Sequence, residues 1–141
     1  VFSQGSRVYL VWKEFDGEST GIFGMHSIDG GKSWSAPEKL IFPNPNSSVM
    51  GLRLHDKTVL LAFNNSEENR ENLSLARSVD EGKSWKVIHV FEASDPGNPT
   101  GSEFSYPFLI QGEDETVHLL YTWNRKRIRH VTFNPAFLRG I

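Results

Sequence analysis

The sequence predicts an all-β protein made of repeated antiparallel sheets, and two observations lead to this expectation. An eight-residue string occurs twice, as SIDGGKSW at residues 27–34 and SVDEGKSW at residues 78–85, with six identical positions and starts 51 residues apart. A repeat of this period is typical of propellers and other repeat arrays. Around the two copies lie short segments of alternating apolar and polar residues bounded by turn residues, and none has a convincing helical period.

Ten of these segments are expected to be β-strands, and they cover residues 7–13, 21–27, 38–41, 49–54, 58–64, 72–79, 86–92, 106–110, 117–123 and 128–133. A propeller blade is a four-stranded antiparallel meander, and the repeated string fits the turn between its third and fourth strands. Counted from the two strings, the chain has three, four and three strands of successive blades, with blade segments at about 1–42, 43–93 and 94–141. This makes one partial β-propeller domain, 1–141, of about two and a half blades.

A ring needs at least four blades, so further blades of a longer protein or other copies of this chain are the expected partners that close it. The chain begins with Val and not Met, which favours part of a longer protein over a complete one.

The repeated string has the composition of a tight hairpin turn. Its Asp can accept hydrogen bonds from backbone N–H groups two or three residues later, its second Gly supplies a positive φ, and its Trp is expected to bury a large ring beside the next strand. A phosphate-binding loop is excluded, since it requires a Gly where the two copies have His26 and Arg77. The residues with this structural role are Asp29, Gly31, Trp34, Asp80, Gly82 and Trp85.

Composition narrows the classes of function. With 141 residues, a net charge of −2 and a hydrophobic fraction of 38%, the chain has the composition of one globular domain, without the excess of basic residues that would indicate nucleic acid or a membrane surface. It has no cysteine, and its five histidines lack zinc-ligand spacing, so neither a metal nor another cofactor is expected. No signal peptide or transmembrane run is visible, and secreted, periplasmic and cytoplasmic locations all stay open.

The order of strands separates two faces of the ring. In a meander, the turns that follow first and third strands lie on one face, together with both repeated strings. The turns that follow second strands and the connections between blades lie on the other face, and these loops are long, polar and basic. Sites are usually built on such loops, so this second face is the expected functional face.

The repeated string is the Asp-box, S-x-D-x-G-x-S/T-W, and it resembles the repeat of the sialidase (neuraminidase) superfamily. Further segments look like the C-terminal half of bacterial predicted neuraminidases, which are similar to sialidases and six-bladed by analogy, and the resemblance covers essentially the whole chain. These segments are residues 12–17 (WKEFDG), 42–47 (FPNPNS), 63–65 (FNN) with Arg70, 105–107 (SYP) and 121–125 (YTWNR).

The resemblance implies a retaining glycoside hydrolase that removes terminal sialic acid or a similar acidic sugar from glycans. Tyr106, expected to open an innermost strand, would be the nucleophile, and Glu103 or Glu71 would be the carboxylate that assists it. Arginine forks bind a carboxylate bidentately. The expected substrate-binding residues are Arg70, Arg125, Arg127, Asn64, Asn46 and Glu14, the last of which could act with Asp16 as an acid/base pair.

Each of these residues also has an ordinary structural interpretation. Tyr106 could simply be an aromatic residue at a strand start, and the arginines and asparagines could belong to solvated turns. The sialidase pattern has an arginine shortly before the nucleophilic Tyr, and here no arginine lies between Arg77 and Arg125. Two alternatives therefore stay open: another carbohydrate-active propeller, such as a lyase or a different glycosidase, and a non-catalytic propeller that binds glycans or proteins.

Overall fold

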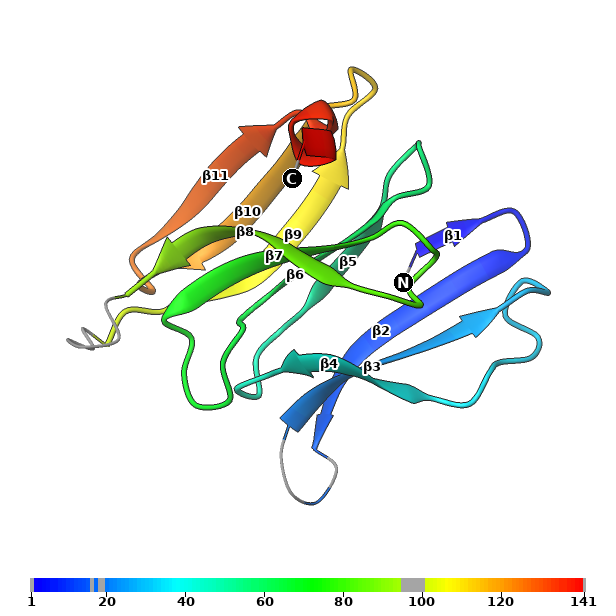
Figure 1. Ribbon diagram of the computed structural model, residues 1–141. Helices are drawn as coiled ribbons and strands as arrows, with labels where there is room; N and C mark the ends of the chain where they lie inside the picture. The colour runs from blue at the N-terminus through cyan, green and yellow to red at the C-terminus, as the bar shows by residue number, and fades with distance from the viewer. Residues whose placement is uncertain (1, 16, 18–19, 95–100, 141) are drawn as a thin grey trace.

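The computed structural model describes residues 2–15, 17, 20–94 and 101–140, and it confirms the all-β, partial-propeller prediction. Three antiparallel sheets follow one another in chain order, β1–β4, β5–β8 and β9–β11 (Figure 1). The strands are β1 (Phe2–Gln4), β2 (Arg7–Phe15), β3 (Thr20–Ser27), β4 (Glu38–Pro43), β5 (Met50–Arg53), β6 (Val59–Phe63), β7 (Asn72–Ser78), β8 (Lys86–Ala93), β9 (Phe104–Gln111), β10 (Val117–Trp123) and β11 (Arg127–Phe133). A short 3-10 helix, Pro135–Gly140, follows β11.

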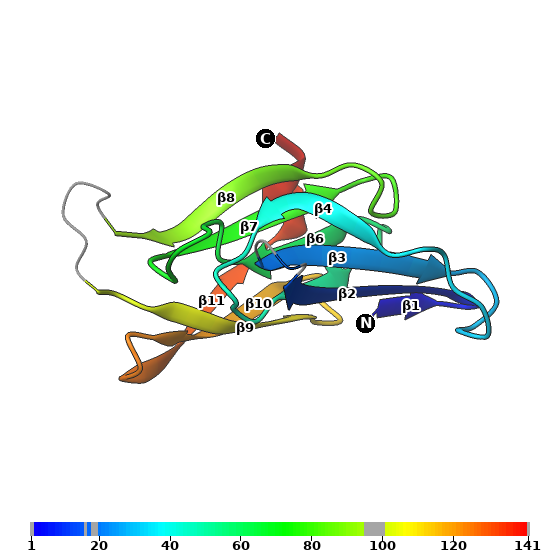
Figure 2. The same ribbon diagram turned by 90° about the horizontal axis from the view of Figure 1, so that it is seen from below.

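The second sheet lies between the other two, and its inner strand β5 contacts both β1 and β9. Figure 2 shows the β3–β4 and β7–β8 connections at one end of the sheets and the β6–β7 and β10–β11 connections at the opposite end. We call the first end, which carries both Asp-boxes, the box face. We call the second end, formed by the connections at residues 44–49, 64–71 and 124–126, by residues 94 and 101–103 and by the end of β2, the loop face.

The first sheet corrects the sequence-based strand count. It has four strands, because β1 pairs with β2 through a turn in which Gly5 has φ 57°. A three-residue strand is too short to show an alternating pattern, which is why the sequence did not indicate it. Strand β9 also begins earlier than expected, since Phe104 and Ser105 already pair with Trp123 and Thr122, so Tyr106 lies within the strand and does not open it.

Two hydrophobic clusters join the three sheets, and β6 takes part in both. All five residues of β6 are buried, and alternate side chains point to opposite faces of the sheet. Leu60 and Ala62 belong to the cluster shared with the third sheet, whereas Leu61 and Phe63 belong to the cluster shared with the first. The uninterrupted apolar run of β6 is therefore the consequence of packing against a neighbour on each side.

Both Asp-boxes form the predicted turns. Asp29 accepts hydrogen bonds from the backbone N–H groups of Lys32 and Ser33, each at 2.9 Å, so one contact has the expected reach of three residues and the other reaches four. Asp80 accepts one from Ser84 N at 2.8 Å. Hydrogen bonds from the hydroxyl and backbone N–H of Ser84 hold the pKa of Asp80 at about 2, and Ser33 lowers the pKa of Asp29 in the same way.

The two box tryptophans are less alike than the sequence indicates. Each indole N–H donates to the backbone carbonyl of its own box glycine, Gly31 or Gly82, and both glycines have φ 89°. Trp85 is half-buried and packs edge-on against Phe42 in the core. Trp34 is exposed, with 38% of its surface accessible, because its box closes an edge of the first sheet that no sheet covers among the described residues.

Candidate functional site

Glu103 lies at the centre of a polar cluster on the loop face. Its carboxylate accepts hydrogen bonds from Arg125 Nε at 2.7 Å, Ser105 Oγ at 2.8 Å and Arg70 Nη1 at 3.3 Å, and its side chain is only 16% exposed. Burial alone would raise the pKa of Glu103. The hydrogen bonds from Ser105 and Arg125 and the charges of Arg125 and Arg70 outweigh it, so this pKa lies below its usual value and the group is ionised at neutral pH.

Arg70 connects this cluster to two further segments. Its Nη2 donates to the backbone carbonyl of Asn46 at 3.2 Å, and its guanidinium carbon lies 5.8 Å from the centre of the Tyr106 ring. The backbone carbonyl of Arg70 accepts a hydrogen bond from Phe104 N at 2.9 Å. One arginine therefore touches the connection before β5, the start of β9 and the carboxylate of Glu103, and it fixes how these loops meet.

Tyr106 is held in an unusual backbone conformation. Its φ is 55°, a value that non-glycine residues adopt rarely, and the pairing of β9 with β10 shifts register at this point. The ring is 62% exposed. Within the described part of the chain its hydroxyl has no hydrogen-bond partner, so the bulge presents a phenol to the loop-face surface. Backbone strain of this kind is concentrated at functional sites.

The predicted asparagines have different environments. Asn64 is fully buried, where its amide donates to the carbonyls of Asn72 and Phe104 and its oxygen accepts from Ser47 Oγ at 2.5 Å. It joins three loops and is not available to a ligand. Asn46 is exposed, has φ 56° and accepts a hydrogen bond from Lys13 Nζ, so it does line the surface.

The structure does not bring the remaining predicted residues to the cluster. Glu71 accepts a hydrogen bond from Gly101 N at 2.8 Å, and Glu14 accepts one from Trp12 Nε1 at 2.8 Å. Arg127 lies 4.3 Å over the ring of its neighbour Trp123, on the outer strand β11. Asp16, the expected companion of Glu14, lies outside the described residues.

Two adjoining hollows border the cluster. The first, of about 440 Å³, brings together the first, second and third sheets, and it is lined by Val11, Trp12, Lys13, Asn46, Ser48, Val49, Arg70 and Tyr106. The second, of about 480 Å³, is lined by Gly101, Ser102, Glu103, Asn124, Arg125 and Lys126. Arg70 lines the first hollow and Glu103 the second, and the ion pair between these two residues links the hollows.

Sequence reasoning missed three residues of this surface. Lys13 binds Asn46, Trp12 lines the first hollow, and Ser105 holds Glu103. Lys13 stands at the loop-face end of β2, and the sequence alternation of that strand could have placed it there. Ser105 had no such signal, since its contact depends on the bulge in β9.

The described residues contain no group of three or more His, Cys, Asp or Glu side chains that could hold a metal ion. Among those same residues no helix is long and apolar enough to cross a membrane. The chemistry that the loop face offers is therefore that of a phenol, two arginines and an ionised carboxylate, arranged around a polar surface.

The fold is that of a partial β-propeller, with Asp-boxes on one face and a polar loop cluster on the other. The chain belongs to the family of BNR repeat-like domains, whose model matches residues 2–119. No curated protein matches the sequence.

Solved structures that resemble the chain include two fungal enzymes and one bacterial enzyme. A GH93 α-L-arabinofuranosidase of Fusarium graminearum, in complex with arabinobiose, has a TM-score of 0.68 at 19% identity, over 91% of this chain and 42% of that one. An α-L-arabinanase of Penicillium chrysogenum, also with arabinobiose, has a TM-score of 0.66 at 18% identity, over 91% of this chain and 42% of that one. The NanB sialidase of Streptococcus pneumoniae has a TM-score of 0.66 at 14% identity, over 93% of this chain and 22% of that one. This chain thus spans less than half of the length of each.

Proposed function

We propose that the loop face is part of the sugar-binding site of a propeller-type glycoside hydrolase. The observation that best supports this function is the cluster of Tyr106, Arg70 and Glu103, which brings a phenol, a guanidinium and an ionised carboxylate beside an open hollow. Such groups suit a ligand that carries many hydroxyls and develops charge during bond cleavage.

In this proposal Tyr106 attacks the anomeric carbon of a terminal sugar, the glycosidic bond breaks and the leaving oxygen takes up a proton. Water then hydrolyses the bond between Tyr106 and the sugar, so the product retains its configuration. The exposed ring on a strained bulge supports this role, because it is accessible and held in one position. Glu103 is the nearer candidate for a proton relay, since it contacts the arginine that lies against Tyr106. Glu71, which is bound to a loop N–H, is the other.

The first candidate substrate is a terminal sialic acid or a similar acidic sugar, whose carboxylate would bind to Arg70 and Arg125. The 78% exposure of Arg125 supports this candidate, since its guanidinium faces solvent on the rim of the second hollow. Both arginines already bind the carboxylate of Glu103, so an acidic sugar has to compete with Glu103 for them.

The second candidate is a neutral terminal sugar, and the same ion pairs favour it. With Glu103 bound to both arginines, their positive charge is compensated within the protein, and Arg70 becomes a donor to sugar hydroxyls. Two of the similar structures contain arabinobiose, a neutral disaccharide. The completed site needs the remaining blades of a ring, from the same protein or from other copies of the chain.

Glu103→Gln separates the two candidates. The substitution removes the internal carboxylate and frees both arginines, so N-acetylneuraminate should bind about tenfold more tightly, the value of one charge-assisted hydrogen bond. Arabinobiose should bind equally well or less tightly. Titration calorimetry of both sugars with the wild type and the variant gives the comparison.

Arg70→Gln and the matched control Arg129→Gln complete the experiment. Arg129 pairs with Glu92 on the outer strand of the third sheet, away from the hollows. Arg70→Gln should weaken whichever sugar binds, and Arg129→Gln should not. If a sugar binds to the wild type and both arginine variants behave alike, the loop face is not the sugar site.

A further inference from the structure

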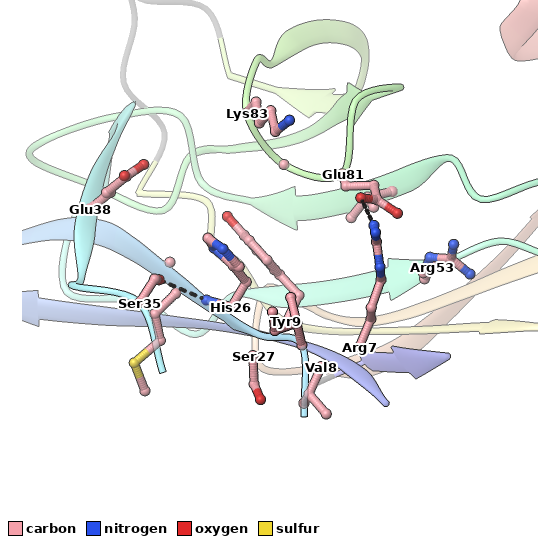
Figure 3. Close-up of a pocket in the computed structure, with 15 residues that line it drawn as sticks. Arg7, Val8, Tyr9, His26, Ser27, Ser35, Glu38, Arg53, Glu81 and Lys83 are labelled. Carbon is pink, nitrogen blue, oxygen red and sulfur yellow. Dashed lines mark hydrogen bonds and ion pairs between the residues drawn. The ribbon is translucent and has the colours of Figure 1, made fainter. Parts of the chain in front are cut away.

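A second cavity lies on the box face, far from the cluster just described. It has a volume of about 380 Å³, within the range of small-molecule sites, and it lies between the first and second sheets (Figure 3). Its walls come from the starts of β2 and β6, the ends of β3 and β5, and both Asp-box loops. The proposed sugar site does not use this cavity, and none of its lining residues belongs to the loop face.

Tyr9 forms the floor of the cavity and joins the two sheets. A Cβ atom added to Gly82 would lie 2.8 Å from Cζ of the Tyr9 ring, and one added to Gly24 would lie 2.4 Å from the Tyr9 hydroxyl oxygen. The ring is therefore packed against the bare backbone of a glycine in each sheet. Burial, and secondly the charge of Glu38, raises the pKa of the Tyr9 phenol, so it stays neutral and able to form hydrogen bonds with a ligand.

The charges around the cavity do not balance. Arg7, from the first sheet, forms an ion pair with Glu81 of the second Asp-box, which Figure 3 shows as a dashed line. Arg53 and Lys83 also line the cavity, and neither side chain has an ion pair or hydrogen bond with a residue that the structure describes. The one further carboxylate in the lining is Glu38. The lining thus carries one net positive charge, from three cations and two carboxylates, with His26 counted as neutral.

The rest of the lining suits a sugar ring. Tyr9 offers apolar surface to C–H groups, while the imidazole of His26 and the carboxylate of Glu38 can bind hydroxyls. Inorganic phosphate would leave the apolar part of the cavity uncovered, and a neutral sugar would leave Arg53 and Lys83 without partners. The guanidinium of Arg53 and the ammonium of Lys83, beside the apolar part of the cavity, can bind an oxyanion that is carried on a small polar ring.

We propose that this box-face cavity binds a monosaccharide-sized sugar that carries an oxyanion, a carboxylate or a sulfate, with the charged group on Arg53 or Lys83 and the ring against Tyr9. The site does not depend on the proposed hydrolysis, because it uses no residue of the loop face. It gives the protein a place to hold a charged part of a glycan while another part reaches the opposite face.

The test is a titration of the chain with D-glucuronate, glucose 6-sulfate and glucose at low ionic strength, followed by NMR or calorimetry. Glucuronate or glucose 6-sulfate should bind at least tenfold more tightly than glucose, and the tighter of the two identifies the charged group. Arg53→Gln with Lys83→Gln should weaken that binding at least tenfold. Added salt should weaken it as well.

Two controls make the result specific. Lys86→Gln removes an exposed cation next to the second Asp-box that does not line the cavity, and Arg129→Gln removes an arginine of the third sheet that pairs with Glu92. Neither should change the affinity by more than about twofold. If the double variant does not fold, Arg53→Gln and Lys83→Gln are tested singly, and at least one of them should weaken binding about threefold or more. Equal binding of glucose, no binding of either anion, or a loss caused by Arg129→Gln would overturn the proposal.

Discussion

Glu103 holds the loop face together at the scale of single residues. Its carboxylate binds side chains from the β6–β7 connection, from β9 and from the β10–β11 turn. Its own backbone N–H donates to Asn124 Oδ1 at 2.7 Å. Removing one partner from a half-buried charged network lowers its stability, because the other charged group loses its hydrogen bonds. The position of the Arg70 side chain therefore depends on which residue stands at position 103. This coupling is why one substitution, Glu103→Gln, can report the charge of the sugar that the site takes.

The second Asp-box makes stability depend on pH in a defined direction. The pKa of Asp80 falls from 3.8 to about 2 in the folded protein, because the hydroxyl of Ser84 and then its backbone N–H donate to the carboxylate. A depressed folded pKa stabilises the fold fully above the unfolded value and loses that effect as the pH falls toward 2. The free energy of unfolding should therefore decrease between about pH 4 and pH 2.

Asp80→Asn should flatten this part of the pH profile, as measured by urea unfolding at several pH values. Glu113→Gln is the matched control, since Glu113 is an exposed turn carboxylate on the same face. A profile that keeps its slope in the Asp80 variant, or loses it equally in the control, would contradict the assignment.

At the scale of elements, the box turns decide how closely neighbouring sheets approach. Gly82 has a positive φ and lies against the ring of Tyr9 from the first sheet, whereas Gly30 has a positive φ and nothing within 4 Å of its added Cβ. Both positions require a positive φ, but only Gly82 lies in the contact between two sheets. Strand β6 also lies between two sheets, and all five of its residues are buried.

Gly82→Ala should therefore destabilise the protein more than Gly30→Ala. The unfavourable φ should lower the free energy of unfolding of both variants by about 1 kcal/mol. Gly82→Ala should lose a further ~1–3 kcal/mol of this free energy, because the new methyl group overlaps Tyr9. Thermal and urea unfolding of the two variants give the difference. Equal losses would mean that Tyr9 does not pack between the sheets as described.

The whole molecule is a sector of a ring with one apolar face uncovered. The third sheet buries one face against the second, while the opposite face of β9 and β11 exposes Phe108 at 52%, Ile110 at 45% and Ile128 at 65%. The corresponding apolar face of the second sheet is covered by the first sheet. A patch of this type is typical of an interface.

The isolated chain should consequently self-associate. Light scattering after size exclusion should give masses above 16.0 kDa that rise with concentration. Phe108→Ser should reduce the association, and Ile41→Ser, at an exposed apolar position of the first sheet, should leave it unchanged. A constant monomer mass at every concentration would show that the uncovered face needs no partner.

The sequence predicted the fold well because the fold rests on local signals. Each Asp-box closes its turn within eight residues, and each longer strand has its own alternation. The site was predictable only in outline. Strand order indicated which loops share a face, whereas the pairs that define the cluster join Glu103 to residues 33 and 22 positions away. The box-face cavity had no signal, since Tyr9 and Arg53 belong to no motif and meet Lys83 of the second Asp-box only when the sheets pack.

The most direct test of the central claim is an NMR map of sugar binding on the wild-type chain. With N-acetylneuraminate or arabinobiose at increasing concentration, the backbone amides of Asn46, Arg70 and Tyr106 should shift together, with one dissociation constant. Lys13 and Glu103 should follow, because they contact these residues directly. Saturable shifts confined to the box face, with the amides of Asn46, Arg70 and Tyr106 unmoved, would contradict the assignment of the loop face as a sugar site.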